Sequence, residues 1–163
     1  MTPVLDLSVE EWDQVLGLNL RAPFLLSRGF ARRLIAAKRS GAIVNISSTA
    51  SVLARPGIAH YGSSKAALNQ FTRVLAVELA PHGIRVNAVL PGVIETETVK
   101  AALSTPEAKA EMNTKLSRIP MGRLGSPEEV AQLATFLLSA EASYSTGGLF
   151  TADGGFSLGI ARY

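Results

Sequence analysis

The chain has 163 residues, of which 47% are hydrophobic and 18% are charged, with no cysteine and a formal net charge of +3. A disordered tail has fewer apolar residues and a collagen-like chain has periodic glycine, so this composition indicates one globular domain that buries about 68–70% of its unfolded surface. The absence of cysteine excludes disulfides and thiolate zinc sites. Because only two histidines remain, His60 and His82, we expect no metal site.

No apolar run approaches the ~20 residues that a membrane-spanning helix needs. The first residues also lack the basic and apolar regions of a signal peptide. A chain without cysteine fits a reducing compartment. We therefore expect a cytoplasmic protein without a membrane partner.

The first predicted helix begins after Ser8, which is followed by the first-turn acids Glu10 and Glu11, and its pattern continues towards Lys38 with a kink at Pro23. Six basic residues fall within twenty residues of this segment that contain no acid: Arg21, Arg28, Arg32, Arg33, Lys38 and Arg39. Nucleic acid is one partner for such a stripe. We favour the solvated face of a helix, because apolar residues lie between the charges: Phe24, Leu25, Leu26, Phe30, Leu34 and Ile35.

Three short β-favouring runs follow along the chain, at residues 42–46, 84–90 and 149–152. The first run is apolar on both faces, which is typical of a parallel strand covered by helices.

Helical patterns separate these runs. One extends from near Tyr61 to Leu79 and is stopped by Pro81-His82-Gly83, and another begins at Ser126 and ends near Ser139. Between them, residues 97–118 are polar with helical character, as in a mobile or substrate-covering segment. Strands that alternate with helices predict an α/β fold with a parallel sheet and helices on both faces.

Three polar residues indicate proton-transfer chemistry. Ser48 follows the first predicted strand, at the edge where α/β sheets place their ligands. Tyr61 and Lys65 are four residues apart on one helix, so their side chains share a face. An ammonium beside a phenol lowers the tyrosine pKa from about 10 towards the range of a general acid or base, and Ser48 could hydrogen-bond the same substrate oxygen.

Each of these signals is weak alone, but the order in which they occur resembles the short-chain dehydrogenases/reductases, including bacterial 3-oxoacyl-[acyl-carrier-protein] reductases. The resemblance spans essentially the whole chain. It rests on five segments, at residues 12–20, 41–48 (Gly-Ala-Ile-Val-Asn-Ile-Ser-Ser), 61–65 (Tyr-Gly-Ser-Ser-Lys), 83–92 (ending Val-Leu-Pro-Gly) and 148–155 (ending Ala-Asp-Gly-Gly). It implies the C-terminal part of a Rossmann-type, doubly wound parallel sheet with flanking helices.

The resemblance also implies roles for four residues in converting a small-molecule alcohol to a carbonyl or the reverse. Tyr61 would exchange the hydroxyl proton, and Ser48 would polarise the carbonyl. Lys65 would lower the tyrosine pKa and hold the nicotinamide ribose, while Asn19 would anchor a water that links Lys65 to solvent. The alternatives are an ordinary helix residue for Asn19 and a capping hydroxyl for Ser48.

The cofactor implied is NAD or NADP. Its nicotinamide would be lined by Pro91, Gly92, Val93 and Thr96, although Thr96 could instead only begin the polar segment. Asn87, within a predicted strand, is interpreted as a structural hydrogen-bonding residue.

The cofactor's main binding element does not occur in this sequence. No Gly-x-Gly is present among the 14 glycines, and the family's Asn-Asn-Ala-Gly segment is also absent. Residues 1–163 therefore form one incomplete domain that lacks the N-terminal βαβ units. We expect the apolar edge of the strand at residues 43–46 to be unpaired, which favours association through strand pairing between copies, exchange of elements or a second chain.

Two functions follow. The chain is either part of an NAD(P)-dependent oxidoreductase, inactive or weakly active by itself, or a non-catalytic interaction and oligomerisation module. Nucleic-acid binding is disfavoured. The sequence does not identify the substrate, and it does not indicate whether NAD or NADP is preferred.

Overall fold

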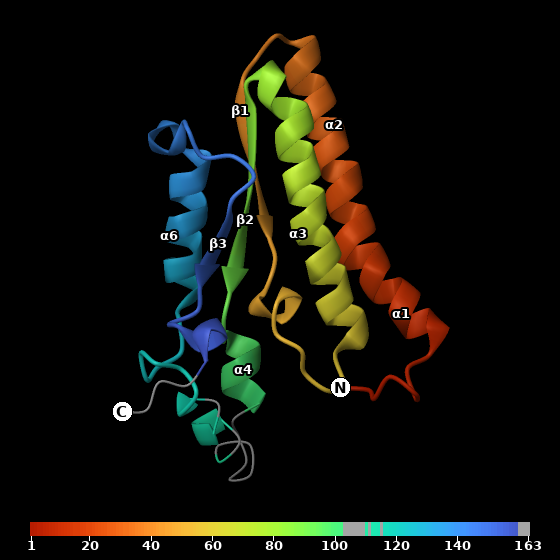
Figure 1. Ribbon diagram of the computed structural model, residues 1–163, viewed down its shortest axis with the longest axis vertical. Coiled ribbons are helices and arrows are strands. Elements are labelled where there is room, and N and C mark those ends of the chain that lie inside the picture. Colours follow the sequence, from red (N-terminus) through yellow and green to blue (C-terminus); the bar gives the residue numbers. More distant parts are fainter. Residues whose placement is uncertain (103–109, 111, 115, 160–163) are drawn as a thin grey trace.

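The computed structural model describes residues 1–102, 110, 112–114 and 116–159. Helix α6 (Pro127–Leu138) covers one face of a three-stranded sheet, and helices α2 (Ala22–Ala36) and α3 (Ala59–Leu79) lie on the other (Figure 1). The predicted layering of helices on both faces of a sheet is confirmed. Within the described residues, no helix is both long and apolar enough to cross a membrane.

The sheet contains β1 (Gly41–Ile46), β2 (Ile84–Pro91) and β3 (Leu149–Ala152) in the order β1-β2-β3. Both pairs are parallel, as predicted; Gly41 lies opposite Ile84, and Ala88 lies opposite Leu149. Strand β1 forms one edge of the sheet, so the predicted unpaired edge is observed.

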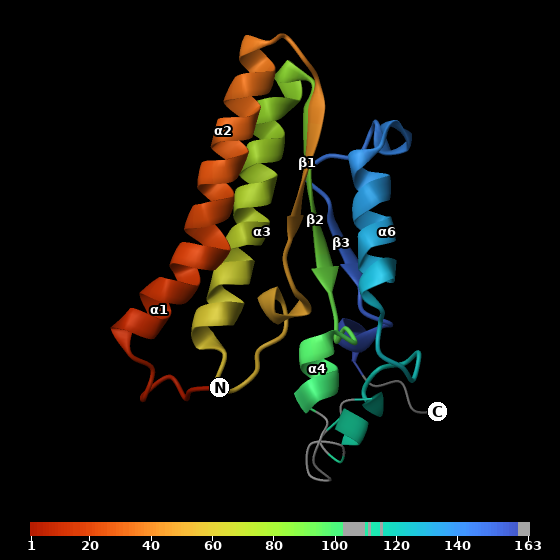
Figure 2. The same ribbon diagram turned by 180° about the vertical axis from the view of Figure 1, so that it is seen from behind.

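The first helical segment has three parts, α1 (Val9–Leu16), a π-helical turn (Gly17–Arg21) and α2, which run in line beside α3 (Figure 2). Ser8 begins α1 with a capping box, because its Oγ accepts from the Glu11 N–H at 3.1 Å and the Glu11 carboxylate binds back. The π turn ends two residues before Pro23, the position at which the kink was predicted. Pro23 has no N–H to donate to the carbonyl four residues earlier, which disrupts the regular helical pattern.

The fully buried residues of helix α2 are small, and most of its large apolar residues stay exposed. The helix buries Ser27 and Ala31, and Phe24 meets Phe71 of α3 edge to face with ring centroids 6.0 Å apart. Five of the six apolar residues predicted to form its apolar face are exposed: Phe24, Leu25, Leu26, Phe30 and Ile35. Leu26 and Phe30 are exposed beside the open sheet edge, where they line a groove with β1, whereas Phe24, Leu25 and Ile35 do not line that groove.

Helix α3 ends where the sequence predicts. A short 3-10 turn (Ala80–His82) follows it, and Gly83 adopts the left-handed conformation at φ 69°, which glycine accommodates without strain. The core is divided by the sheet into two clusters. Leu75 and Ile84 belong to the cluster on the α3 face, and Val89 and Leu137 belong to the cluster on the α6 face.

Polar side chains of β2 hold the start of β3 and the end of α6. Asn87 is 0% exposed; its Nδ2 donates to the Ser145 carbonyl at 2.8 Å, and its Oδ1 accepts from the Gly148 N–H at 3.0 Å. The structural interpretation of Asn87 is therefore confirmed. Arg85 donates to the carbonyl of Leu137 at 2.7 Å, satisfying an acceptor that the helix end leaves free.

The polar segment at residues 97–118 begins with α4 (Glu97–Ala102). Much of the remainder lies outside the described residues, so the prediction of a mobile or substrate-covering segment stays a prediction.

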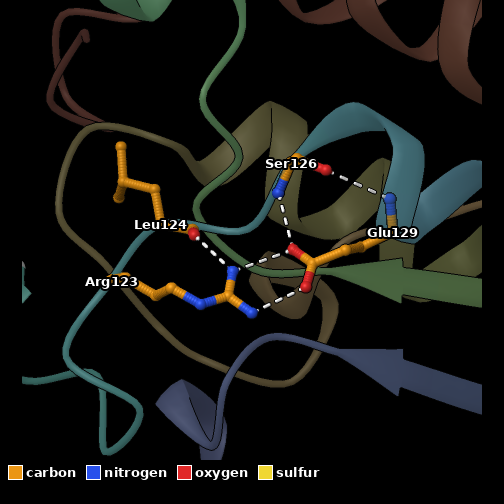
Figure 3. A network of polar contacts seen from close by, with 4 residues as sticks. All are labelled: Arg123, Leu124, Ser126 and Glu129. Carbon is orange, nitrogen blue, oxygen red and sulfur yellow. Dashed lines mark hydrogen bonds and ion pairs between the residues drawn. The ribbon is translucent and has the colours of Figure 1, made fainter.

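A charged network fixes the start of α6 (Figure 3). Arg123 donates to both carboxylate oxygens of Glu129, at 2.7 and 3.0 Å, and the Ser126 N–H donates to the same carboxylate at 2.8 Å. Ser126 Oγ in turn accepts from the Glu129 N–H at 3.3 Å, which completes a second capping box. The hydrogen bonds from Arg123 and then from Ser126 lower the pKa of Glu129 to about 2.

This lowered pKa predicts how the substitution Glu129→Gln affects stability. A carboxylate whose folded-state pKa is depressed stabilises the fold above its unfolded pKa of about 4.3 and loses that contribution as the pH falls towards 2. The melting temperature of the variant should lie below that of the wild type at neutral pH. This difference in melting temperature should disappear as the pH falls from the unfolded pKa of Glu129 to its folded pKa of about 2. Thermal unfolding followed by circular dichroism measures the difference. In an Arg123→Met background the difference in melting temperature should be smaller. A difference that does not change with pH would contradict the lowered pKa of Glu129.

Candidate active site

The first two turns of α3 present the predicted tyrosine and lysine together. Lys65 Nζ lies 5.8 Å from the centroid of the Tyr61 ring, within the range of a cation–π contact. The i and i+4 spacing therefore has the predicted effect, because both side chains lie on one side of the helix. Lys65 Nζ also donates to the carbonyl of Ile46, the last residue of β1, at 2.9 Å.

Lys65 is half-buried, and this burial lowers the pKa of its ammonium. Its backbone is held to the sheet as well, since Ser47 Oγ donates to the Lys65 carbonyl at 3.2 Å. About two turns later along α3, Asn45 Nδ2 donates to Thr72 Oγ1 at 2.9 Å in the buried interface. These bonds hold α3 against the carboxyl end of β1.

Ser48 leaves the sheet at this same end. Its Oγ accepts from the Ala50 N–H at 3.1 Å, and its carbonyl accepts from Ser51 Oγ at 2.6 Å, so that Ser48 begins a 3-10 turn (Thr49–Ser51). The capping alternative is thus observed. A hydroxyl that accepts one hydrogen bond keeps its proton for donation, so capping leaves Ser48 able to bind a substrate oxygen.

Asn19 reaches the same helix from the π turn. Its Nδ2 donates to Ser64 Oγ at 3.1 Å, and Ser64 Oγ donates to the Tyr61 carbonyl at 2.7 Å. Asn19 is therefore tied to the turn that carries Tyr61 and is not an isolated helix residue. Ser64, which is 1% exposed, was not among the predicted site residues. Its position between Tyr61 and Lys65 was the available signal.

The segment after β2 is held close to the end of β3. The Gly92 N–H donates to the Ala152 carbonyl at 3.0 Å, and a Cβ on Gly92 would lie 2.6 Å from Asp153 Cβ, so a side chain does not fit there. Val93 follows, and its carbonyl accepts from the Gly125 N–H at 3.1 Å. Thr96 Oγ1 accepts from the Val99 N–H at 3.3 Å and caps α4, as expected of a residue that begins the polar segment.

Two concave regions lie near these residues. A groove of about 370 Å³ runs beside β1 and is lined by Asn19 and Lys65, among others. A second cavity of about 510 Å³ lies beyond β2 and β3, bordered by Ile94, Thr151 and Asp153. The structure thus gathers Ser48, Tyr61, Lys65 and Asn19 around the carboxyl end of β1.

This arrangement brings together groups that can exchange protons. A phenol, an ammonium and a hydroxyl come from adjoining elements at the end of parallel strands, where α/β folds bind small ligands. A tyrosine in hydrogen-bond reach of a substrate oxygen can act as a general acid or base.

Comparisons with known proteins agree with the predicted family. Residues 1–157 match the family described as enoyl-(acyl carrier protein) reductase. The 3-oxoacyl-[acyl-carrier-protein] reductase of Thermotoga maritima is 45% identical over 146 residues, which make up 90% of this chain and 57% of the relative. The chain thus spans little more than half the length of that relative.

Solved structures share the fold. A mutant 4-hydroxyisoleucine dehydrogenase complexed with NADH and succinate has a TM-score of 0.92 and 38% identity, with 98% of this chain and 65% of the other covered. Gluconate 5-dehydrogenase of Burkholderia cenocepacia, in complex with NADP and tartrate, has a TM-score of 0.89 and 32% identity, with 98% and 61% covered. The predicted Rossmann-type fold is therefore confirmed, and the chain belongs to the short-chain dehydrogenase/reductase family.

Proposed function

We propose that this chain is the proton-transfer part of an NAD(P)-dependent oxidoreductase that interconverts an alcohol and a carbonyl group in a small molecule. The observation that carries the proposal is the placement of Lys65 Nζ, 5.8 Å from the Tyr61 ring and 2.9 Å from the Ile46 carbonyl, at the end of β1. Residues 1–163 would form a single incomplete domain of this enzyme, located in the cytoplasm because a cysteine-free chain fits a reducing compartment.

Tyr61 exchanges a proton with the substrate oxygen in this proposal. Ser48 donates its hydroxyl proton to the same oxygen and holds it near the phenol. Both roles are supported by position, since Ser48 lies two residues beyond Ile46, whose carbonyl binds the lysine of the Tyr61 helix.

Lys65 and Asn19 support this transfer. The Lys65 ammonium lies 5.8 Å from the centroid of the Tyr61 ring and so places a positive charge beside the reacting groups. Asn19 holds the turn of Tyr61 through Ser64 and lines the same groove as Lys65, where it could anchor a water. Asn19 is thus assigned a positioning role.

The described residues fit the nicotinamide end of NAD(P). Lys65 offers a hydrogen-bond donor to the ribose hydroxyls. Pro91 ends β2 at the same edge of the sheet, and Gly92, Val93 and Thr96 follow it. When bound, the cofactor supplies or accepts the hydride. No glycine-rich turn is present among these 163 residues to bind a pyrophosphate.

Two copies of the chain would associate through the outer faces of α2 and α3. Leu25 of α2 is 49% exposed and Val77 of α3 is 76% exposed, with Phe24 and Val74 also exposed. Apolar residues gathered on one surface mark protein interaction sites. The same exposed face also favours the alternative function, a non-catalytic interaction module derived from the family.

Cofactor binding by the chain alone should be weak. The nicotinamide contacts are too few to offset the loss of translational freedom without a pyrophosphate site. Titration with NADH and NADPH by calorimetry should give no saturation below roughly 100 μM. A dissociation constant in the nanomolar to low-micromolar range would contradict this expectation.

Catalysis is tested with a fusion of this chain to the part of the Thermotoga maritima relative that it does not match. The fusion should oxidise alcohols or reduce carbonyl compounds with NAD(H) or NADP(H), and Tyr61→Phe should lower kcat by about 10²-fold or more. The substitution keeps the ring and removes only the phenol hydroxyl. Activity that survives it would refute the assigned role, and a folded, cofactor-binding fusion without activity would favour the module.

Association is tested with Leu25→Arg. The wild type should sediment as an oligomer and the variant as a monomer, because a buried unpaired charge is costly. A wild-type chain that is a monodisperse monomer would refute self-association.

A further inference from the structure

Two hydrogen bonds connect α3 to Ser48 through the turn that follows it. Asn69 Nδ2 donates to Ser51 Oγ at 2.8 Å, and Ser51 Oγ donates to the Ser48 carbonyl at 2.6 Å. A hydroxyl has one proton, which Ser51 gives to this carbonyl, so the Asn69 atom that faces Ser51 has to be a donor. The asparagine amide therefore sets the direction of both bonds.

Ser48 is held at its backbone and at its side chain. Its carbonyl accepts a second hydrogen bond, from the Ser51 N–H at 3.0 Å, and its Oγ accepts from the Ala50 N–H at 3.1 Å. Ser48 itself is extended, with φ −165° and ψ 155°, immediately before the 3-10 turn (Thr49–Ser51). Because its carbonyl and its Oγ both bind this turn, the orientation of the Ser48 hydroxyl depends on where the turn lies.

The same turn contacts α3 at a second point, beside Tyr61. A Cβ on Gly62 would lie 3.1 Å from the Ala50 carbonyl oxygen, so the backbone of the turn approaches the helix closely there. Asn69 holds the turn about two helical turns further along α3. Two contacts at different positions along one helix determine where the turn lies on it. They therefore set the position of Ser48 relative to Tyr61.

Stability alone does not explain an asparagine at position 69. Asn69 is 5% exposed, and its Oδ1 has no hydrogen-bond partner among the described residues. A buried amide oxygen without a partner destabilises a fold, and an apolar side chain of similar size, such as leucine, avoids this cost. The contact that the amide makes, and that leucine could not make, is the hydrogen bond to Ser51.

We infer that Asn69 and Ser51 are positioning residues, which hold the Ser48 hydroxyl in the orientation that bonds the substrate oxygen. This inference rests on the proposed function of Ser48 and Tyr61. A hydroxyl that is aimed at the oxygen in advance stabilises the charge that develops there without having to reorganise. Neither positioning residue is required to touch the substrate, because each acts through Ser48.

The test on the chain itself compares the hydrogen exchange of two backbone amides by NMR. The Ala50 N–H is bound by Ser48 Oγ, whereas the Ser47 N–H is bound by a carbonyl of β2 at 2.8 Å. Ser51→Ala should speed exchange of the Ala50 amide about tenfold and Asn69→Leu about threefold, because each removes a hydrogen bond that holds the turn. Exchange at Ser47 should not change, whereas a general loss of stability would speed exchange at both amides.

Two variants are matched controls. Ser51→Thr keeps the hydroxyl and should exchange like the wild type. Gln70→Leu removes an exposed amide from the same helix and should leave the Ala50 amide unchanged. Any of three results would overturn the inference: equal acceleration at Ala50 and Ser47, an effect of Gln70→Leu as large as that of Asn69→Leu, or no acceleration in Ser51→Ala.

Catalysis provides a second readout, in the fusion to the Thermotoga maritima segment. Ser51→Ala should lower kcat about tenfold with little change in KM, because the Ser48 hydroxyl acts on the charge of the transition state. In a Ser48→Ala background the same substitution should change kcat by less than about twofold, since no hydroxyl is left to position.

A tenfold loss of kcat in both backgrounds would show that Ser51 only maintains the fold, and would overturn the inference. The two readouts also separate this inference from the proposed function. If the unsubstituted fusion is inactive, the proposed function fails, and accelerated exchange at Ala50 still supports the hold of Asn69 and Ser51 on Ser48.

Discussion

The hydrogen-bond ladder between β1 and β2 is the constraint on which the rest of the structure depends. It aligns Gly41 with Ile84 and extends to the bond between Ser47 and Val89. Because parallel strands end at the same edge, the segments after Ile46 and Pro91 leave the sheet together. The crossover helix α3 must begin at that edge, which brings its first turns, with Tyr61 and Lys65, to the same place.

Ile46 connects the proposed chemistry to the open edge of the sheet. Its carbonyl points away from β2 and accepts the hydrogen bond from Lys65 at 2.9 Å. The lysine thus satisfies an acceptor that a neighbouring strand would otherwise bind, and its burial lowers the pKa of its ammonium. Lys65 therefore joins the proposed proton-transfer groups to the edge of the sheet.

The apolar surface that the chain leaves exposed falls on two sides of α2. Leu26 and Phe30 border the groove beside β1, whereas Leu25 lies outside it. Small residues, Ser27 and Ala31, make the buried contact of this helix. A helix that buries its small residues and exposes its large ones is suited to contacts beyond the chain itself.

The local structure could be predicted from the sequence, because caps, helix stops and side-chain periodicity act over a few residues. Ser8 and Ser126 begin their helices, Gly83 ends one, and the four-residue spacing of Tyr61 and Lys65 places them on one face. Only the tertiary structure decided the contact between Asn19 and Ser64, 45 residues apart, and the exposure of the large apolar residues of α2. Periodicity shows which residues share a face of an element but not which faces meet, and that depends on how the sheet and its covering helices pack.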